Sequence, residues 1–249
     1  MKQRVIVITG GASGIGKETA FKLAEENVKL VIADLNLDAA RKVAQTLEKD
    51  GHQARAFKMD VSKEEDFQKV LEFTVSEFGT ITGIFNNAGI GIQKPLLDMD
   101  YDTYKKVIEI DQDSIYFGTR LTAKKMIELG VENGVIVNTA SIYGYMAAQQ
   151  SYNYHAAKAA VVMMTKAGAI ELAEHNIRVV AVAPGFVDTP ILEALDEEVK
   201  AHIASQHMRK KLIDPKEIAN VVRFLFSDEA SAINGSTIAV DDGFLAFKQ

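Results

Sequence analysis

Short runs of apolar, mostly β-branched residues alternate with longer, charged and periodic segments along the chain, and this alternation restricts the fold more than any other feature of the sequence. The short runs show no polar alternation, which is typical of parallel strands that helices cover on both faces. The pattern therefore predicts an α/β fold with a doubly wound parallel sheet. We expect strands at 4–9, 29–33, 53–58, 83–86, 134–139, 178–183 and 236–240, and helices at 15–27, 37–50, 63–78, 101–129, 151–175 and 215–226.

The alternation is not interrupted by a linker, a repeat or a low-complexity tract, so we expect residues 1–249 to form a single domain. A chain of 249 residues that is 47% hydrophobic and 25% charged can bury a sizeable core. The least regular stretch is 188–213, between the sixth and seventh expected strands. We expect it to form a pair of short helices that act as a substrate lid, because lids over active sites are commonly built from such connections.

Composition argues against several classes of protein. No stretch approaches the roughly 20 apolar residues of a membrane span, and the first strand begins too early for a signal peptide. We therefore expect a cytoplasmic protein without a membrane partner. The absence of cysteine excludes disulfides and thiolate chemistry, and the five histidines show no metal-ligand spacing, so no metal is expected. A net charge of −6 argues against nucleic acid as a partner.

A glycine-rich turn at 9–16 joins the first expected strand to the first expected helix. Glycines let a backbone turn tightly and approach a pyrophosphate, whose charge then lies at the helix N-terminus. A plain turn is the alternative reading, but a position between a strand and a helix is the context that supports a nucleotide site. We therefore expect a dinucleotide to contact Gly10, Ser13, Gly14, Ile15 and Gly16.

Acidic residues end the second and third expected strands. Asp34 can accept hydrogen bonds from an adenosine ribose and would repel a 2′-phosphate, and its neighbour Leu35 brings no cation, so NAD is favoured over NADP. A helix N-cap is the alternative role for Asp34. Asp60, next to Val61, can either reach an adenine amino group or cap the following helix. Beyond the fourth strand, small residues and amides stand where a cofactor would pass, and the expected contacts there are Asn87, Ala88 and Gly89.

Tyr154 and Lys158 stand four residues apart in an expected helix, and Ser141 follows the preceding strand. Residues at this spacing share one helix face. An ammonium beside a phenol favours the phenolate and lowers the tyrosine pKa from its usual value of about 10. Such a tyrosine can exchange a proton with an alcohol or a carbonyl, and a serine hydroxyl can hold the same oxygen. The pair alone also occurs by chance in many helices, so its meaning depends on the other motifs.

Together these motifs resemble the short-chain dehydrogenase/reductase family over nearly the full length of the chain. The glycine turn, the acidic residue after strand two, the Asn-Asn-Ala-Gly run, the serine and the Tyr-x-x-x-Lys motif occur in the family's order. The segment at 184–190 is similar to the loop that holds nicotinamide in the family. The resemblance implies a seven-stranded Rossmann-type sheet, a nicotinamide cofactor, reversible oxidation of an alcohol to a carbonyl, and a homotetramer.

The resemblance also implies individual roles. Tyr154 would be the acid/base, Ser141 would orient the substrate oxygen, and Lys158 would hold the nicotinamide ribose and lower the tyrosine pKa. Thr189, with the backbone of Val187, would fix the carboxamide of the cofactor. Further cofactor contacts are expected at Ile110, Pro184 and Gly185, and substrate contacts at Ser141, Tyr143, Gln149, Tyr154 and Phe186.

One position departs from the family pattern. Asp111 stands where the family carries an asparagine that is thought to support a water linking the lysine to solvent. Aspartate accepts the same hydrogen bonds but cannot donate when it is ionised, and its charge would raise the pKa values of Lys158 and Tyr154. A working relay, a shifted pH optimum and a weakened enzyme are the three outcomes. We expect an active enzyme with an altered pH profile.

The sequence thus predicts an NAD-dependent oxidoreductase for a small to medium secondary alcohol or ketone, with a polyol or diol among the candidates. A reductase of 3-oxoacyl thioesters is one alternative, although such reductases usually take NADPH and Asp34 favours NAD. An NAD-binding sensor or scaffold without turnover is the other, and Asp111 is the feature that keeps it open. Titration of the cofactor and a panel of secondary alcohols would separate these three functions.

Overall fold

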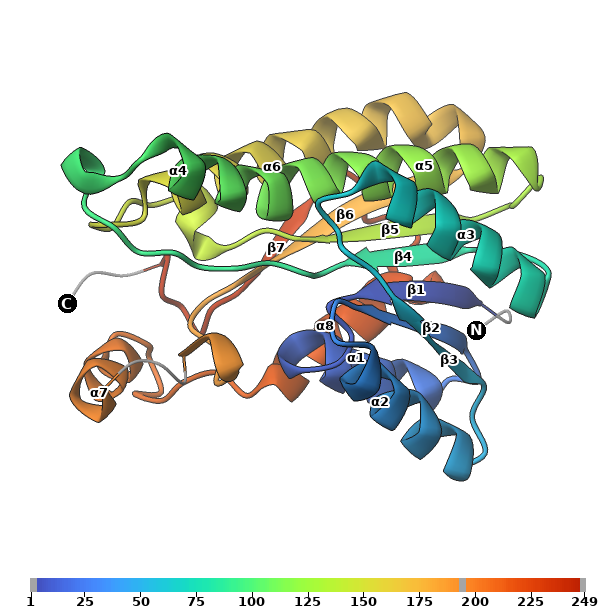
Figure 1. Cartoon of the computed structure of the whole chain (residues 1–249), viewed down its shortest axis with the longest axis horizontal. Coiled ribbons are helices and arrows are strands. Elements are labelled where there is room, and N and C mark those ends of the chain that lie inside the picture. Colours follow the sequence, from blue (N-terminus) through green and yellow to red (C-terminus); the bar gives the residue numbers. More distant parts are fainter. Residues whose placement is uncertain (1–3, 193–195, 247–249) are drawn as a thin grey trace.

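The computed structural model describes residues 4–192 and 196–246, which form a sheet with the strand order β3-β2-β1-β4-β5-β6-β7 (Figure 1). Each pair of neighbouring strands is parallel. The predicted doubly wound parallel sheet is therefore confirmed, and the strand bounds differ from the expected ones by a residue or so. The strands are β1 (Val5–Thr9), β2 (Lys29–Asp34), β3 (Ala54–Lys58), β4 (Gly83–Asn86), β5 (Gly134–Thr139), β6 (Ile177–Pro184) and β7 (Thr237–Val240).

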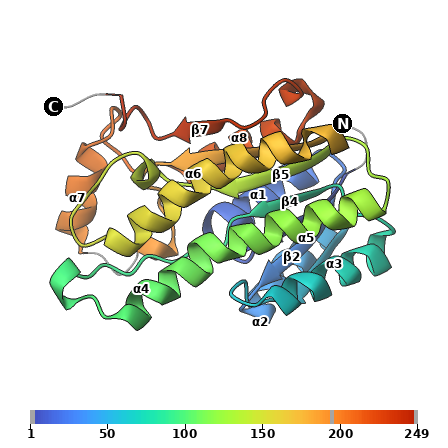
Figure 2. The same ribbon diagram turned by 90° about the horizontal axis from the view of Figure 1, so that it is seen from above.

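Helices cover both faces of the sheet (Figures 1 and 2). One face carries α3, α4, α5 and α6, and the other carries α1, α2 and α8. Helix α7 lies apart from both layers, beyond the carboxyl ends of the strands. The helices are α1 (Gly14–Ala24), α2 (Leu37–Lys49), α3 (Glu64–Phe78), α4 (Tyr101–Ile108), α5 (Ser114–Glu128), α6 (Tyr152–Leu172), α7 (Glu197–Ser205) and α8 (Pro215–Phe226).

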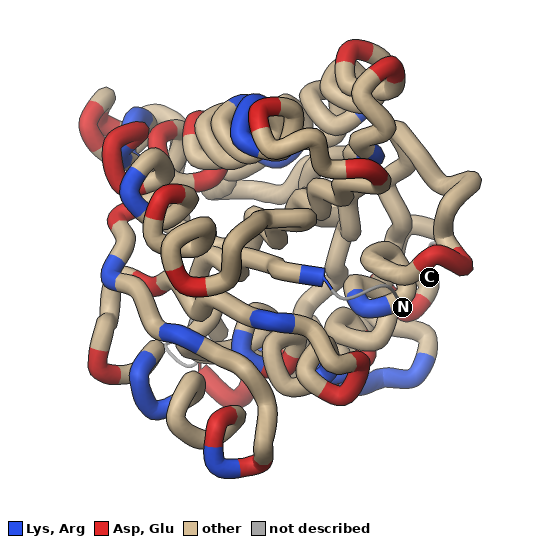
Figure 3. The backbone as a smooth tube through the Cα atoms, turned by 90° about the vertical axis from the view of Figure 1, so that its right-hand side faces the viewer, with Lys and Arg blue, Asp and Glu red and all other residues tan. Residues whose placement is uncertain are grey.

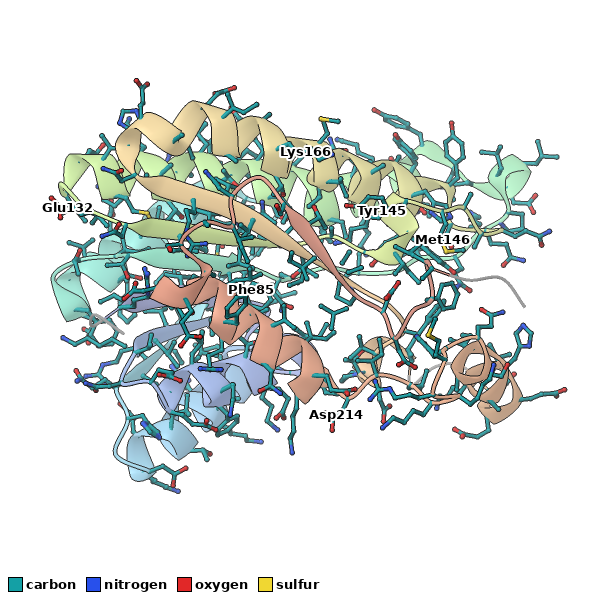
Figure 4. All side chains as sticks on the ribbon, turned by 180° about the vertical axis from the view of Figure 1, so that it is seen from behind. Phe85, Glu132, Tyr145, Met146, Lys166 and Asp214 are labelled. Carbon is teal, nitrogen blue, oxygen red and sulfur yellow. The ribbon has the colours of Figure 1, made fainter. Side chains whose placement is uncertain are left out.

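The central strands bury side chains on both faces, as their continuous apolar runs predict. Ile6 of β1 belongs to a core cluster with Phe226 of α8, and Phe85 of β4, labelled in Figure 4, belongs to the same cluster. Val7, the next residue of β1, packs in a second cluster with Phe67 of α3 on the opposite face. Because successive strand side chains point to opposite faces, one short apolar run supplies both cores.

The long helix expected at 101–129 is interrupted. Helix α4 ends at Ile108, a π-helical turn spans Glu109–Asp113, and α5 begins at Ser114. A π-helical turn inserts a residue into the helical repeat, and such turns occur frequently at functional sites. This one carries Asp111, whose side chain is fully buried.

The expected lid at 188–213 contains a 3₁₀ turn, Pro190–Leu192, and helix α7; residues 193–195 lie outside the described part of the chain. Its end is joined to its beginning by a parallel bridge between Val187 and Ile213. Beyond α7, Arg209 bonds Asp242 after β7 and Glu217 of α8. The segment is therefore held to the sheet at its ends by backbone pairing and ion pairs.

Lysines and arginines are interspersed with acidic residues over the face shown in Figure 3. Within residues 4–192 and 196–246, no helix has both the length and the apolarity that a membrane crossing requires. In the same ranges, no group of three or more histidine, aspartate and glutamate side chains is arranged to hold a metal ion.

Candidate active site

A cavity of about 420 Å³ opens at the carboxyl ends of the strands, where β1 and β4 send their connections to opposite faces. Ligands in open α/β sheets bind at such a switch point. Figure 4 labels Tyr145 and Met146 near this end of the sheet and Glu132 at the other end. The cavity brings together nearly all of the predicted site residues, namely Gly10, Ser13, Gly14, Ile15, Asp34, Leu35, Asp60, Val61, Asn87, Ala88, Gly89, Ile110, Asp111, Ser141, Tyr143, Tyr154, Lys158, Pro184, Gly185, Phe186, Val187 and Thr189.

The glycine turn has the backbone geometry that its sequence predicts. Gly10 adopts φ +63°, a left-handed conformation that favours glycine. Gly16 does not line the cavity: it lies one step inside α1, where a Cβ would run into the carbonyl oxygen of Gly10. Ser13 occupies the N-cap position of α1 without making a side-chain cap bond. The first N–H groups of α1 are thus directed to the cavity, an arrangement that suits an anion.

Asn87 braces this turn. Its Nδ2 donates to the carbonyl oxygens of Thr9 (3.0 Å) and Gly10 (3.2 Å). The Thr9 hydroxyl in turn accepts hydrogen bonds from the backbone N–H groups of Asn87 (2.9 Å) and Ala88 (3.1 Å). The connection after β4 is therefore tied to the turn after β1, and both walls of the cavity keep a fixed spacing.

Asp34 presents its carboxylate at the cavity and does not cap α2. Its Oδ2 accepts from the N–H of Ala12 (3.0 Å) and its Oδ1 from the N–H of Asn36 (2.9 Å). The N-cap of α2 is Asn36, whose side chain accepts from the N–H of Ala39 (3.1 Å). The capping alternative for Asp34 is therefore wrong, and the carboxylate is oriented by the glycine turn itself.

Asp60 is not the N-cap of α3 either, because Lys63 occupies that position. The Asp60 Oδ1 atom accepts hydrogen bonds from the hydroxyl (2.7 Å) and the N–H (3.1 Å) of Ser62. The hydroxyl bond is the largest of the effects that hold the pKa of Asp60 below its usual range, against the effect of burial. An ionised carboxylate thus lines the cavity near Leu35.

Ser141, Tyr154 and Lys158 converge as predicted. Ser141 is the second residue after the end of β5, and Tyr154 and Lys158 lie on one face of α6. Lys158 Nζ donates to the carbonyl oxygen of Thr139 (3.0 Å) and lies 5.4 Å from the centre of the Tyr154 ring. The Ser141 Oγ atom accepts a hydrogen bond from the N–H of Tyr143 (3.2 Å), and the Ser141 hydroxyl acts to lower the pKa of Tyr154. The Thr139 carbonyl is a partner that no side-chain pattern in the sequence indicates.

Asp111 joins this group directly. Its Oδ2 lies 3.0 Å from Lys158 Nζ, and its Oδ1 accepts a hydrogen bond from the N–H of Ile90 (2.8 Å). The pair is buried, and Gly89 leaves room for it, since a Cβ there would lie 3.0 Å from Asp111 Oδ2. The carboxylate therefore connects α6 to the segment that follows β4.

The pKa of the Tyr154 phenol lies above its usual value. Burial is the largest cause, the Asp111 carboxylate adds to it, and the Lys158 ammonium and the Ser141 hydrogen bond act in the opposite direction. For Lys158, burial alone would lower the pKa, but Asp111 and Tyr154 outweigh it and the net direction is upward. The direction for Tyr154 is opposite to the lowering expected from the lysine alone and agrees with the effect expected of Asp111.

Aromatic rings form the wall next to the tyrosine hydroxyl. Tyr143 stands edge-on to Tyr154, with ring centres 6.1 Å apart, and edge-on to Phe186 at 5.8 Å. Both Tyr143 and Phe186 line the cavity, as predicted for substrate contacts. Gln149, the remaining predicted substrate contact, does not line the cavity and is exposed. The next residue, Gln150, is tied to a different segment, since its carbonyl oxygen accepts a hydrogen bond from the N–H of Lys94 (2.8 Å).

The strand order, the π-helical turn and the Ser–Tyr–Lys group at one cavity define a Rossmann-like α/β protein, and comparisons with known proteins identify its family. A family model described as enoyl-(acyl carrier protein) reductase matches residues 10–245. A solved short-chain dehydrogenase/reductase from Mycobacterium marinum superposes with a TM-score of 0.94 at 30% identity, covering 98% of this chain and 96% of that one. The chain belongs to the short-chain dehydrogenase/reductase family of oxidoreductases, which use nicotinamide cofactors.

Curated relatives cover nearly the whole chain. Cyclohexanol dehydrogenase of Acinetobacter sp. (strain SE19) is 38% identical over 242 residues, which are 97% of this chain and 94% of that protein. The cis-4-hydroxycyclohexanecarboxylate dehydrogenase of Sinomonas cyclohexanicum is 38% identical over 245 residues, 98% of this chain and 97% of that protein. A 3-oxoacyl-[acyl-carrier-protein] reductase of Thermotoga maritima is 36% identical over 248 residues, 98% of this chain and 99% of that protein.

Proposed function

We propose that this protein is an NAD-dependent oxidoreductase that interconverts a neutral secondary alcohol and its ketone, with Tyr154 as the acid/base. The observation that carries the proposal is the group of Ser141, Tyr154 and Lys158 at one end of a cavity whose other end presents the Asp34 carboxylate. A single ligand that spans this cavity would meet a ribose acceptor at one end and a proton donor at the other.

The residues present fit a dinucleotide. Gly16 lets the turn close tightly against the Gly10 carbonyl, and the N-terminus of α1, which Ser13 does not cap, offers N–H donors for a pyrophosphate. Asp34 would accept from the adenosine ribose, and Lys158 and Thr189 line the same cavity, Thr189 beside Gly14. When bound there, the nicotinamide supplies or accepts the hydride.

The preference for NAD rests on the charges around Asp34. A carboxylate held by the Ala12 and Asn36 N–H groups is acceptor-only when ionised and repels a 2′-phosphate. The first cation after Asp34 along the chain, Arg41, is paired with Asp38 at 3.2 Å and is exposed, while Lys58 of β3 is the register partner of Asp34. The bonded Asp34 carboxylate at the cavity is therefore the feature that supports NAD over NADP.

The chemistry of the protein itself is orientation and proton transfer. The Ser141 hydroxyl would hold the substrate oxygen, and Tyr154 would take the alcohol proton during oxidation or give it back during reduction. Lys158, fixed by Asp111 and the Thr139 carbonyl, stands behind the phenol and would stabilise its anion. Tyr143 and Phe186 would exclude water from the reacting oxygen.

The shape and charge of the pocket favour an apolar, uncharged substrate over a 3-oxoacyl thioester on a carrier. Lys94 and Arg209 do not line the cavity but have side chains long enough to approach its opening, and both are already paired with carboxylates. Lys94 lies 2.6 Å from Asp100, and Arg209 lies 2.6 Å from Glu217 and 2.7 Å from Asp242. The relative named for cyclohexanol makes an uncharged alicyclic alcohol the first candidate, with diols and polyols next. The relative named for a hydroxycyclohexanecarboxylate shares the alicyclic ring and carries an additional anionic group.

We also propose a homotetramer in the cytoplasm. Helices α5 and α6 lie side by side on one face of the molecule (Figure 2). Large apolar side chains are exposed there: Met163 and Ile170 on α6 are 61% and 79% exposed, and Tyr116 on α5 is 49% exposed. A patch of this kind on a single chain marks a contact surface. Sedimentation or light scattering of the purified protein tests the assembly.

The test of function uses the purified full chain with NAD or NADP and a panel of cyclohexanol, cyclopentanol, acyclic secondary alcohols, diols and a 3-oxoacyl thioester. We expect NAD-dependent oxidation of the cyclic alcohols and its loss in Tyr154→Phe. Turnover of the thioester alone, and only with NADPH, would contradict the proposal and indicate a 3-oxoacyl thioester reductase. Tight NAD binding without turnover of any compound would indicate a non-catalytic NAD-binding sensor.

A further inference from the structure

Two histidines outside the catalytic group each bind the backbone of one residue in the aromatic wall. His155, which follows Tyr154 on α6, places its Nδ1 2.9 Å from the Tyr143 carbonyl oxygen. Its Nε2 accepts from the N–H of Ala148 (2.9 Å), and its ring lies 4.6 Å from that of Tyr143. A neutral imidazole with the proton on Nδ1 satisfies both bonds. The catalytic helix therefore holds the segment that carries Tyr143.

His207 holds the other half of the wall. It follows α7 in the lid and is 0% exposed. Its Nε2 accepts a hydrogen bond from the N–H of Phe186 (3.3 Å), and its ring stands edge-on to those of Phe186 and Phe244 at 6.0 and 5.4 Å. Gly185 permits this approach, since a Cβ there would lie 2.9 Å from Nε2. The lid is thus bonded to the backbone beside the cavity.

The two halves meet in front of the acid/base. Tyr143 and Phe186 are in edge-to-face contact, and Tyr143 touches Tyr154 in the same manner. Burial lowers the pKa of His207, although Asp241 and Asp242 act against it, so the imidazole keeps the lone pair that the Phe186 N–H requires. A shift of either histidine would move a ring that borders the reacting oxygen.

We propose that His155 and His207 are positioning residues that determine substrate specificity: by fixing Tyr143 and Phe186 they set the width of the pocket in front of Tyr154. The proposal rests on the proposed function, because the wall matters for catalysis only if an alcohol binds beside Tyr154. A compact alicyclic ring needs a fixed wall to hold its hydroxyl at the tyrosine, whereas a small flexible alcohol does not. A misplacement of about 1 Å can cost about 100-fold in rate.

The kinetic test compares His207→Leu with His207→Gln, because glutamine keeps an acceptor for the Phe186 N–H and leucine does not. For the leucine variant we expect KM for the cyclic alcohol to rise about tenfold or more, with a smaller change for an acyclic alcohol and an unchanged Kd for NAD. The glutamine variant should recover most of the loss. His155→Leu and His155→Gln repeat the comparison on the Tyr143 side, and His202→Leu, exposed on α7, is the matched control.

A second readout does not depend on turnover. In protein labelled with 4-fluorophenylalanine, Phe186→Leu assigns the Phe186 ¹⁹F resonance. We expect that resonance to shift or broaden in His207→Leu and to keep its position in His207→Gln and His202→Leu. An unchanged resonance together with an unchanged KM in His207→Leu would overturn the proposal. Absence of turnover in the native chain would instead contradict the proposed function, while the resonance still tests whether His207 fixes the wall.

Discussion

Lys158 Nζ lies 3.0 Å from Asp111 Oδ2, and the two side chains are 3% and 0% exposed. This ion pair lies beside Tyr154, the proposed acid/base. A lone buried ammonium would favour the tyrosinate of Tyr154, whereas an ammonium paired with a carboxylate does so less effectively. The structure therefore combines the proposed catalytic group of Ser141, Tyr154 and Lys158 with an additional carboxylate beside the lysine.

Replacing Asp111 by asparagine should lower the pH at which alcohol oxidation becomes fast. Asp111 raises the pKa of Tyr154, in addition to the larger effect of burial. Oxidation needs the deprotonated tyrosine as base, so removal of the charge lowers that pKa and moves the acidic limb of the kcat/KM profile to lower pH. The measurement is the pH–rate profile of the two proteins with the same alcohol and saturating NAD.

The matched control is Asp113→Asn, on the same π-helical turn but not at the cavity. Its profile should coincide with that of the native protein. If the profiles of the native chain and Asp111→Asn also coincide, the carboxylate has no part in tuning Tyr154.

Replacing Lys158 by methionine should abolish turnover and destabilise the fold by about 3–5 kcal/mol, because it leaves the Asp111 carboxylate buried without its partner. The double variant Lys158→Met, Asp111→Asn should recover most of the stability but none of the activity, since the amide needs no counter-ion. Urea unfolding of the native chain, Lys158→Met, Asp111→Asn and the double variant measures the differences in unfolding free energy. A Lys158→Met protein as stable as the native chain would contradict the burial of an ionised pair.

Replacing Asp34 by alanine should weaken NAD binding by about 10- to 100-fold, the range expected for lost hydrogen bonds to a charged group. Binding of NADP should weaken less or improve, because the repulsion of a 2′-phosphate disappears. Titration calorimetry with both cofactors gives the ratio of the two Kd values. The control is Asp38→Ala, a paired and exposed carboxylate nearby; equal effects of the two substitutions would remove Asp34 from the cofactor site.

The free energy of unfolding should decrease when the pH drops below about 6.5, the usual pKa of histidine, and His207 should account for part of the decrease. Burial lowers the pKa of His207 in the folded chain, against Asp242, Asp241 and its bond to the Ala204 backbone, with Arg209 acting in the same direction as burial. The unfolded chain then binds a proton more readily than the folded chain as pH drops. The contribution is present above about pH 6.5 and is lost as pH falls towards the folded pKa.

Unfolding free energies of the native chain and His207→Gln, measured between about pH 7.5 and about pH 5, check this expectation. The native chain should lose more stability over the range. His202→Gln, an exposed histidine on α7, should behave like the native chain. A parallel course for the native chain and His207→Gln would mean that His207 is protonated equally in the folded and unfolded states.

Local patterns predicted most of the fold and much of the cavity. Apolar runs without alternation indicated buried parallel strands, and each of the seven lies within a residue or so of its expected position. Parallel strands bring their carboxyl ends to one edge, so motifs that follow them, such as the glycine turn and Asp34, were expected to meet there. Tyr154 and Lys158 were expected on one helix face because residues four apart in a helix lie on the same side.

Other features depended on contacts between distant elements. No local pattern indicated the π-helical turn that carries Asp111, the Thr139 carbonyl that binds Lys158, or the outward course that exposes Gln149. Nor did any pattern bring His207, which follows α7, to the backbone of Phe186. Such contacts are set by how whole elements pack, and small offsets in packing decide which polar groups meet.

The sequence by itself thus determined the family and the succession of strands and helices along the chain, and it predicted that Ser141, Tyr154 and Lys158 act together, because these depend on residue types at short spacings. The tertiary structure alone decided how the group is charged and enclosed. Burial and the 3.0 Å approach of Asp111 to Lys158 reverse the direction of the Tyr154 pKa shift expected from the lysine alone. Desolvation and distance determine that direction, and neither quantity exists until the chain has folded.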